Sequence, residues 1–282
     1  MSTPQPPTEH VGDVAVWTAL PIREIDGWTQ TVDVYAPPGP ARPRPALICL
    51  HGGGWSGGAP AGWRGFALEF AARFDVVVVS CGYRLVDRGR FPTQLRDAAN
   101  AVRWVRANAA HWAIDPARFG VCGDSAGGWL SAMIALTHAH PGLAGGEPVN
   151  GESAAVQALA VHWGPLDFIA RWYGNGGRAG AEGGMLGTDY LTDPTLYHFA
   201  SPLAHVTAAA PPALFVQGRS DRVVHQQQGE LAHAAWRRHG VPSELLLLDS
   251  IGHVEQADPA DRARCADATR GFFARTLGIA PR

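Results

Sequence analysis

Gly123-Asp124-Ser125-Ala126-Gly127-Gly128 stands between the short apolar run Phe119–Cys122 and an apolar stretch with helical spacing. Glycines two positions before and after Ser125 remove the Cβ atoms that would clash in a sharp strand-to-helix turn. A serine on such a turn projects its hydroxyl above the sheet. The helix that follows directs free N–H groups and its positive dipole end toward negative charge on a bound carbonyl oxygen. The stretch therefore predicts a nucleophile elbow, a site for acyl transfer.

The composition indicates a soluble globular protein. The chain has 282 residues, of which 46% are hydrophobic and 17% charged, with a formal net charge of -2. Positive and negative side chains nearly balance, so the chain lacks the excess of positive charge that would attract nucleic acid or an anionic membrane. The start of the chain lacks a basic segment followed by an apolar one, and no apolar run approaches the roughly 18 residues that span a bilayer. We expect residues 1–282 to form one domain in the cytoplasm.

The basic and thiol residues exclude several chemistries. All 23 basic residues are arginine, and a Schiff-base enzyme or a P-loop nucleotidase needs a lysine. The four cysteines, Cys49, Cys81, Cys122 and Cys265, include no C-x-x-C pair. Their spacing favours buried, reduced thiols over a zinc site, since zinc ligands usually come in close pairs. We therefore expect neither a metal nor a cofactor.

Short apolar, β-branched runs alternate with longer stretches of helical periodicity. This alternation indicates a mostly parallel sheet covered by helices on both faces. The expected strands are Val14–Leu20, Thr31–Tyr35, Ala46–Leu50, Val76–Cys81, Phe119–Cys122, Val156–His162, Ala213–Gln217 and Glu244–Leu248. The expected helices are Gly65–Arg73, Leu95–Ala109, Ala126–His138, Gln226–Arg238 and Asp258–Arg275. The first two strands suit an antiparallel edge hairpin, and the proline-rich stretch Ala36–Pro45 predicts a loop.

The segment Gly164–Val206, which follows the sixth expected strand, departs from this alternation. It is dense in glycine between Gly174 and Gly187 and supplies aromatic surface from Trp172, Tyr173, Tyr190 and Tyr197. Long connections in compact domains are often functional. We expect a small cap or lid insertion at 164–206, with an ordinary surface excursion as the alternative.

A serine hydroxyl needs a base to take its proton and an acid to orient that base. Asp221 comes directly after the expected strand Ala213–Gln217, and His253 follows the next one, Glu244–Leu248. Loops that leave neighbouring parallel strands meet at one sheet edge, and the order Ser, Asp, His is typical of this kind of elbow. The sequence therefore predicts a triad of Ser125, Asp221 and His253.

Other acids and histidines compete for these roles. Asp189 and Asp193 fall in the glycine-rich segment. Asp249 directly follows the expected strand Glu244–Leu248, in a less open position than that of Asp221. Asp124, inside the elbow, points away from its neighbour and is interpreted as a local hydrogen-bonding group. The remaining histidines considered lie on or beside helical patterns: His138, His140, His225, His233 and His239.

The stretch His51-Gly52-Gly53-Gly54-Trp55 follows the expected strand Ala46–Leu50. Consecutive glycines let backbone N–H groups turn inward, which predicts an oxyanion hole from Gly53, Gly54 and Ala126. One such donor can contribute about 3 kcal/mol to lowering the barrier. His51 is interpreted as a brace for this loop.

Together these motifs resemble those of the α/β-hydrolase carboxylesterases. The residues that carry the resemblance are the His51–Trp55 loop, Gly82-Tyr83-Arg84-Leu85, Ile114-Asp115-Pro116, Gly123–Gly128, Ser201-Pro202 and Gly252-His253. The similarity extends from about Val32 to Leu277 and is to the branch of hormone-sensitive-lipase-like and bacterial feruloyl-esterase-like proteins. It implies an α/β-hydrolase fold with a mostly parallel eight-stranded sheet, and the same triad and oxyanion donors. The N-terminus has little room for the large helical cap of many lipase-like relatives, so covering the substrate would fall to 164–206.

The expected activity is hydrolysis of small or aromatic carboxylic esters through a covalent acyl-enzyme. Trp55, Trp163, Phe168 and Trp172 fall in or after strand-end loops and are candidates to line the substrate pocket. Three alternatives stay open: an amidase or arylformamidase, acyl transfer to an alcohol, and a ligand-binding protein that has lost turnover. The expected partner is a small-molecule ester, with neither nucleic acid nor membrane, and a homodimer is left open.

Overall fold

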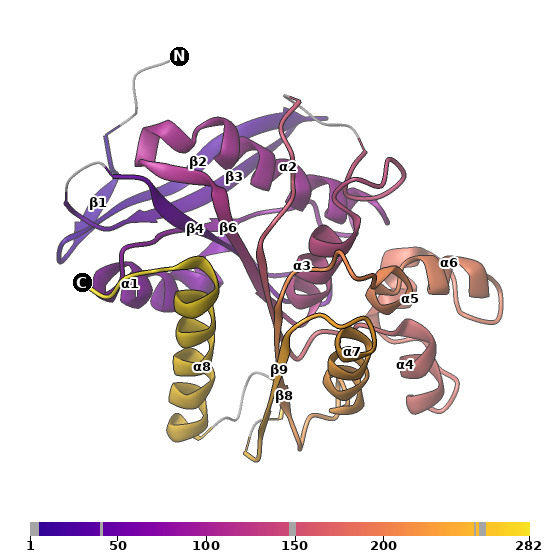
Figure 1. Ribbon diagram of the computed structural model, residues 1–282. Helices are drawn as coiled ribbons and strands as arrows, with labels where there is room; N and C mark the ends of the chain where they lie inside the picture. The colour runs from indigo at the N-terminus through magenta and orange to yellow at the C-terminus, as the bar shows by residue number, and fades with distance from the viewer. Residues whose placement is uncertain (1–5, 40–41, 147–150, 251, 254–257) are drawn as a thin grey trace.

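A twisted sheet forms the centre of the molecule (Figure 1). The computed structural model describes residues 6–39, 42–146, 151–250, 252–253 and 258–282. Over these ranges the sheet has nine strands in the order β1-β2-β3-β5-β4-β6-β7-β8-β9. Their bounds are β1 Glu9–Val11, β2 Val14–Ile25, β3 Trp28–Ala36, β4 Arg44–Leu50, β5 Val77–Cys81, β6 Ile114–Asp124, β7 Ala158–His162, β8 Ala213–Gly218 and β9 Ser243–Leu248.

Strand pairing confirms the mostly parallel sheet. β1, β2, β3 and β5 pair antiparallel in succession, whereas every pairing from β5 through β4 to β9 is parallel. The eight expected strands correspond to β2 through β9. The expected number of strands, eight, is corrected to nine by β1. Its three residues, Glu-His-Val, are all exposed and form no apolar run that would mark a strand in the sequence. The expected loop Ala36–Pro45 is shorter than predicted, since β4 already begins at Arg44, whose backbone N–H donates to the carbonyl of Ala113 at 2.8 Å; Pro40 and Ala41 lie outside the described residues.

Helices cover both faces of the sheet, as the alternation of strands and helices requires. α1 (Arg64–Arg73) and α8 (Pro259–Leu277) pack on one face, and α2 (Thr93–Ala107), α3 (Ala126–Thr137) and α7 (Gln227–Arg238) on the other (Figure 1). Successive residues of β5 alternate between the two cores, with Val77 and Val79 on one side and Val78 on the other. Short 3₁₀ turns lie at Pro60–Trp63 and Ala109–Trp112. Within the described residues, no helix combines the length and apolarity that crossing a membrane requires.

The segment 164–206 contains three short helices beside α3 and α7 (Figure 1). They are α4 (Phe168–Gly174), α5 (Ala181–Leu186) and α6 (Pro194–Phe199), followed by a 3₁₀ turn at Pro202–His205. Phe168 stacks on Trp129 of α3 with ring centroids 5.9 Å apart, and the indole N–H of Trp129 donates to the carbonyl of Ala200 at 2.8 Å. These contacts join the segment to the main core.

Candidate active site

Ser125 occupies a sharp turn between β6 and α3. Its φ of 52° and ψ of -118° lie outside the regions that L-residues usually adopt. A Cβ on Gly123 would collide with the backbone of Gly127, and a Cβ on Gly127 would collide with the carbonyl of Leu50. The backbone at this turn therefore admits only glycine at both positions, for the reason anticipated from the sequence.

A chain of hydrogen bonds joins the three residues of the predicted triad. His253 Nε2 lies 2.9 Å from Ser125 Oγ, and His253 Nδ1 lies 2.8 Å from Asp221 Oδ2. The Asp221 side chain is fully buried and that of His253 is 17% exposed. The carboxylate can thus fix the imidazole with its Nδ1 protonated, which leaves Nε2 free to accept the serine proton.

Backbone amides fix the second oxygen of the Asp221 carboxylate. Oδ1 accepts hydrogen bonds from the N–H groups of Val223 and Val224, both at 2.8 Å. The side-chain amide of Gln217 donates to Oδ2 at 3.3 Å and to the carbonyl of Val224 at 2.7 Å. Such donors hold the carboxylate in one orientation.

The competing acids are engaged elsewhere. Asp189 and Asp193 accept hydrogen bonds from backbone amides of their own turns, and Asp249 pairs with Arg219 on the surface with its side chain 79% exposed. The geometry therefore brings Asp221, and none of these three, to His253.

The glycine loop after β4 lies against the elbow. Gly53 and Gly54 have φ angles of 114° and 57°, and a Cβ on Gly53 would collide with the carbonyl of Gly57. Both residues line the same cavity as Ser125. Ala126 is buried at the first position of α3, where a backbone N–H has no intrahelical acceptor. Gly53 and Gly54 thus lie in the cavity of Ser125 and Ala126 follows Ser125 in the chain, and their role as oxyanion donors stays a prediction.

Buried polar groups brace this loop. Asp124 Oδ1 accepts from the N–H of Gly52 at 3.1 Å, and burial raises the pKa of this carboxyl group. The Tyr83 hydroxyl donates to the carbonyl of His51 at 2.7 Å, and the two rings stack with centroids 4.2 Å apart. Burial lowers the pKa of His51, so its ring is neutral at pH 7. His51 and Asp124 therefore act as structural groups, as interpreted from the sequence, whereas the bracing role of Tyr83 was missed.

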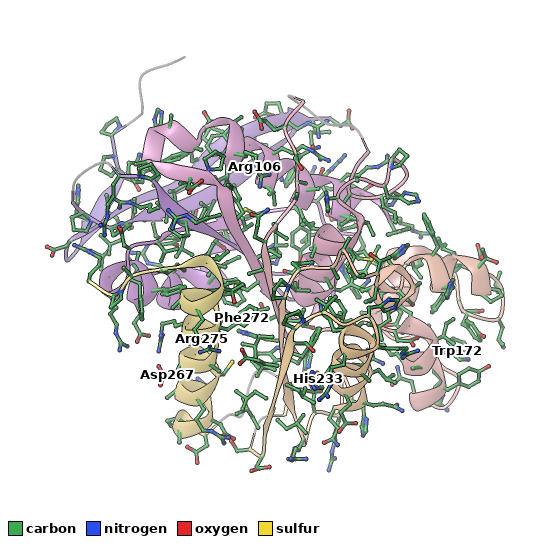
Figure 2. The ribbon with its side chains drawn as sticks, in the orientation of Figure 1. Arg106, Trp172, His233, Asp267, Phe272 and Arg275 are labelled. Carbon is green, nitrogen blue, oxygen red and sulfur yellow. The ribbon has the colours of Figure 1, made fainter. Side chains whose placement is uncertain are left out.

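A cavity of about 1030 Å³ opens above Ser125. Trp55 and Trp163 line it, but Phe168 and Trp172 do not appear among its described lining residues. Phe168 is fully buried against Trp129, and Trp172 lies in α4, beside the other short helices of the segment 164–206 (Figure 2). Of the four candidate pocket residues, Trp55 and Trp163 thus line the cavity, although Trp55 is only 2% exposed, and Phe168 and Trp172 lie away from its described lining.

Several lining residues carry no sequence signal. Trp63 comes from the 3₁₀ turn before α1 and Phe66 from the first turn of α1, and Arg262, Cys265 and Arg270 come from α8. These helices belong to distant parts of the chain and meet only through packing on the same face of the sheet. Their contribution to the site could not be anticipated from local patterns.

Two buried side chains that line the cavity, His162 and Cys265, have pKa values far from their ordinary ones. Burial lowers the pKa of His162 to about 4 and raises the pKa of the Cys265 thiol to about 12. His162 Nε2 lies 2.8 Å from the hydroxyl of Thr269. At pH 7 the imidazole and the thiol are therefore both neutral, so neither is suited to act as a charged nucleophile or acid.

The sheet order, the strained serine turn and its hydrogen-bonded histidine together define an α/β hydrolase. The chain belongs to the BD-FAE family, whose model matches residues 32–236. Among curated proteins it is 29% identical to Esterase LipQ of Mycobacterium tuberculosis over 89% of this chain, and 32% identical to Esterase LipC of the same organism over 67% of this chain. These matches cover 61% of LipQ and 47% of LipC, so the chain spans about half the length of these relatives.

Solved structures share the fold over almost the whole chain. A truncated carbohydrate esterase from gut microbiota superimposes with a TM-score of 0.81 at 22% identity, covering 97% of this chain and 100% of that one. Thermogutta terrifontis esterase 2, phosphoramylated by tabun, superimposes with a TM-score of 0.79 at 25% identity, covering 97% and 98%. The α/β-hydrolase fold is thus confirmed.

Proposed function

We propose that the protein hydrolyses carboxylic esters of small or aromatic substrates through a covalent acyl-serine. The observation that carries this proposal is the hydrogen-bonded chain from Asp221 through His253 to Ser125, which opens on a cavity beside Gly53 and Gly54. The names of the relatives as esterases support it. The trapping of Thermogutta terrifontis esterase 2 by tabun supports a serine nucleophile, because organophosphorus agents react with activated hydroxyls.

In the proposed acylation, Ser125 Oγ forms a bond to the ester carbonyl carbon while His253 Nε2 takes its proton. The carbonyl oxygen becomes an oxyanion, which accepts hydrogen bonds from the N–H groups of Gly53, Gly54 and Ala126. His253 then returns the proton to the alcohol oxygen as the ester C–O bond breaks. Asp221 stays ionised and stabilises the imidazolium throughout.

Deacylation follows the same path with water as the nucleophile. His253 accepts a proton from the water while the water oxygen attacks the acyl carbon. It then returns that proton to Ser125 Oγ as the bond between Oγ and the acyl carbon breaks and the acid departs. These steps require no cofactor. A volume of about 1030 Å³ is large enough for a drug-sized ester, and Trp163 on its wall offers apolar surface for an acyl or aromatic group. We further propose that 1–282 is one hydrolase domain, with 164–206 as a cap that stays packed on α3.

A substrate panel with wild type beside Ser125→Ala tests this proposal. Short acyl phenyl esters should turn over in the wild type, and the variant should lose about 10³-fold or more in kcat while remaining folded. An N-formyl arylamine in the same panel separates amidase activity, and product analysis with an added alcohol separates acyl transfer. A folded Ser125→Ala variant with the wild-type rate would overturn the proposal.

A further inference from the structure

Arg171 of α4 is one of the residues that line the cavity, and two of its three guanidinium nitrogens donate to other groups of the protein. Its side chain is 9% exposed, and its Nε donates to Glu182 Oε2 at 2.9 Å. Its Nη1 donates to the backbone carbonyl of Val223. The guanidinium therefore connects the segment 164–206 to the loop that follows β8.

The carbonyl of Val223 belongs to the same peptide group as the N–H of Val224. That N–H donates to Asp221 Oδ1 at 2.8 Å. One rigid peptide thus receives a hydrogen bond from Arg171 at its oxygen and gives one to the triad carboxylate at its nitrogen. Because hydrogen bonds in series polarise one another, a cation at the oxygen strengthens the bond that the nitrogen donates.

The side chain of Val223 is 49% exposed and contributes little packing to this loop, although that of the next residue, Val224, is buried. Glu182, by contrast, is fully buried, and its Oε1 accepts from the N–H of Gly180 at 2.9 Å. The carboxylate of Glu182 therefore fixes the guanidinium of Arg171, which in turn fixes the carbonyl of Val223. This series of contacts ends at the Val223–Val224 peptide, whose N–H is one of the donors to Asp221.

We propose that Arg171 is a positioning residue for the proposed ester hydrolysis. It holds the Val223–Val224 peptide so that Asp221 keeps the orientation that His253 needs, and it touches neither the substrate nor Ser125. The inference rests on the proposed function, since it concerns the same triad. The Arg171–Glu182 ion pair would thus support the orientation of the triad in addition to joining the segment 164–206 to the rest of the domain.

The test removes the contact without leaving a buried charge alone. Arg171→Met by itself would leave the buried carboxylate of Glu182 without its ion-pair partner, so it is combined with Glu182→Gln. On 4-nitrophenyl acetate we expect kcat to fall by about 10- to 100-fold, with KM within about threefold of wild type. Arg171→Lys is the second variant: it keeps the charge and the ion pair but lacks the planar fork that serves Glu182 and Val223 together, so its kcat should be intermediate.

A double-mutant cycle distinguishes this role from a merely structural one. The same changes are made in an Asp221→Ala background, where no carboxylate remains to be oriented. If Arg171 acts through Asp221, Arg171→Met with Glu182→Gln should lower kcat in this background by less than about twofold. An equal fold-loss in both backgrounds would overturn the proposal, as would a wild-type kcat in the original one. If the double replacement does not fold, the cycle with Arg171→Lys gives the same decision.

Ser125→Ala, assayed in parallel, separates the two proposals. An active Ser125→Ala variant would refute the proposed function and the role of Arg171 with it. An inactive Ser125→Ala variant beside an unaffected Arg171→Met, Glu182→Gln variant would refute the role of Arg171 alone.

Discussion

Asp221→Asn should inactivate the protein without unfolding it, because the surroundings of the side chain select the wrong amide orientation. Two backbone N–H groups, those of Val223 and Val224, point at Oδ1 from 2.8 Å. The asparagine oxygen will occupy that position, which turns the NH₂ group toward His253. The imidazole must then accept at Nδ1 and carry its proton on Nε2, so it cannot take the proton of Ser125.

The magnitude follows from the cost of the opposite orientation. Placing the NH₂ group against the two backbone donors would leave both unsatisfied, at about 1–3 kcal/mol each and so about 2–6 kcal/mol together. The productive orientation would be populated about 30-fold to 10⁴-fold less than the unproductive one. The variant also lacks the negative charge that stabilises the imidazolium. We therefore expect kcat to fall by about 10⁴-fold, as loss of the correct tautomer does in other triads.

The assay is kcat for 4-nitrophenyl acetate beside a thermal unfolding curve. Asp249→Asn is the matched control, because it makes the same chemical change at a carboxylate that pairs with Arg219 on the surface. It should retain the wild-type kcat. A folded Asp221→Asn variant within tenfold of wild type would show that Asp221 does not orient His253.

Three further changes test separate parts of the structure. Gly127→Ala inserts a methyl group against a strand carbonyl and should lower kcat by about 100-fold or more, whereas Gly65→Ala, which meets open space, should not; equal kcat values for the two variants would contradict this. Burial lowers the pKa of His162 from 6.5 to about 4, so below pH 6.5 the unfolded chain binds a proton that the folded protein does not. The free energy of unfolding should therefore drop by up to about 3 kcal/mol between pH 6.5 and pH 4, and a denaturant titration series should find this contribution absent in His162→Gln. Phe168→Ala removes a ring stacked on Trp129 and should cost about 3–5 kcal/mol of stability by urea unfolding; a loss below about 1 kcal/mol would mean that the cap detaches freely.

The sequence predicts the elbow well because its requirements are local. The space for a Cβ at Gly123 and Gly127 depends on one turn, and the apolar run before Ser125 marks its strand. Asp221 and His253 could be placed because each follows a strand, and parallel strands bring their ends to one edge. Chain order and strand ends were sufficient for these residues.

The walls of the cavity depend on contacts between distant elements. Phe168 and Trp172 are as aromatic as Trp55 and Trp163, and nothing in the local pattern tells a core ring from a pocket ring. Trp55 and Phe168 both pack against Trp129 of α3, yet Trp55 lines the cavity and Phe168 is not among its described lining residues. Tertiary packing, rather than residue type, decides which aromatic rings face the cavity.

The ion pair of Arg171 with Glu182 was also beyond local reasoning. Arg171 lies just before the glycine-rich stretch Gly174–Gly187 and Glu182 lies within it, and the composition of that stretch suggests an irregular connection. Their contact, and the contact of Arg171 with Val223, form only when α4 and α5 pack beside the loop after β8. A sequence pattern of period 3.6 or 2 carries no information on such a contact.

The most direct test of the central claim is labelling of the folded protein with a fluorophosphonate, followed by peptide mass spectrometry. An activated Ser125 predicts one adduct per chain on the peptide that contains it, and no adduct in Ser125→Ala or after heat denaturation. Folded wild-type protein that stays unlabelled, or that carries the adduct on another residue, would contradict the assignment of Ser125 as the nucleophile.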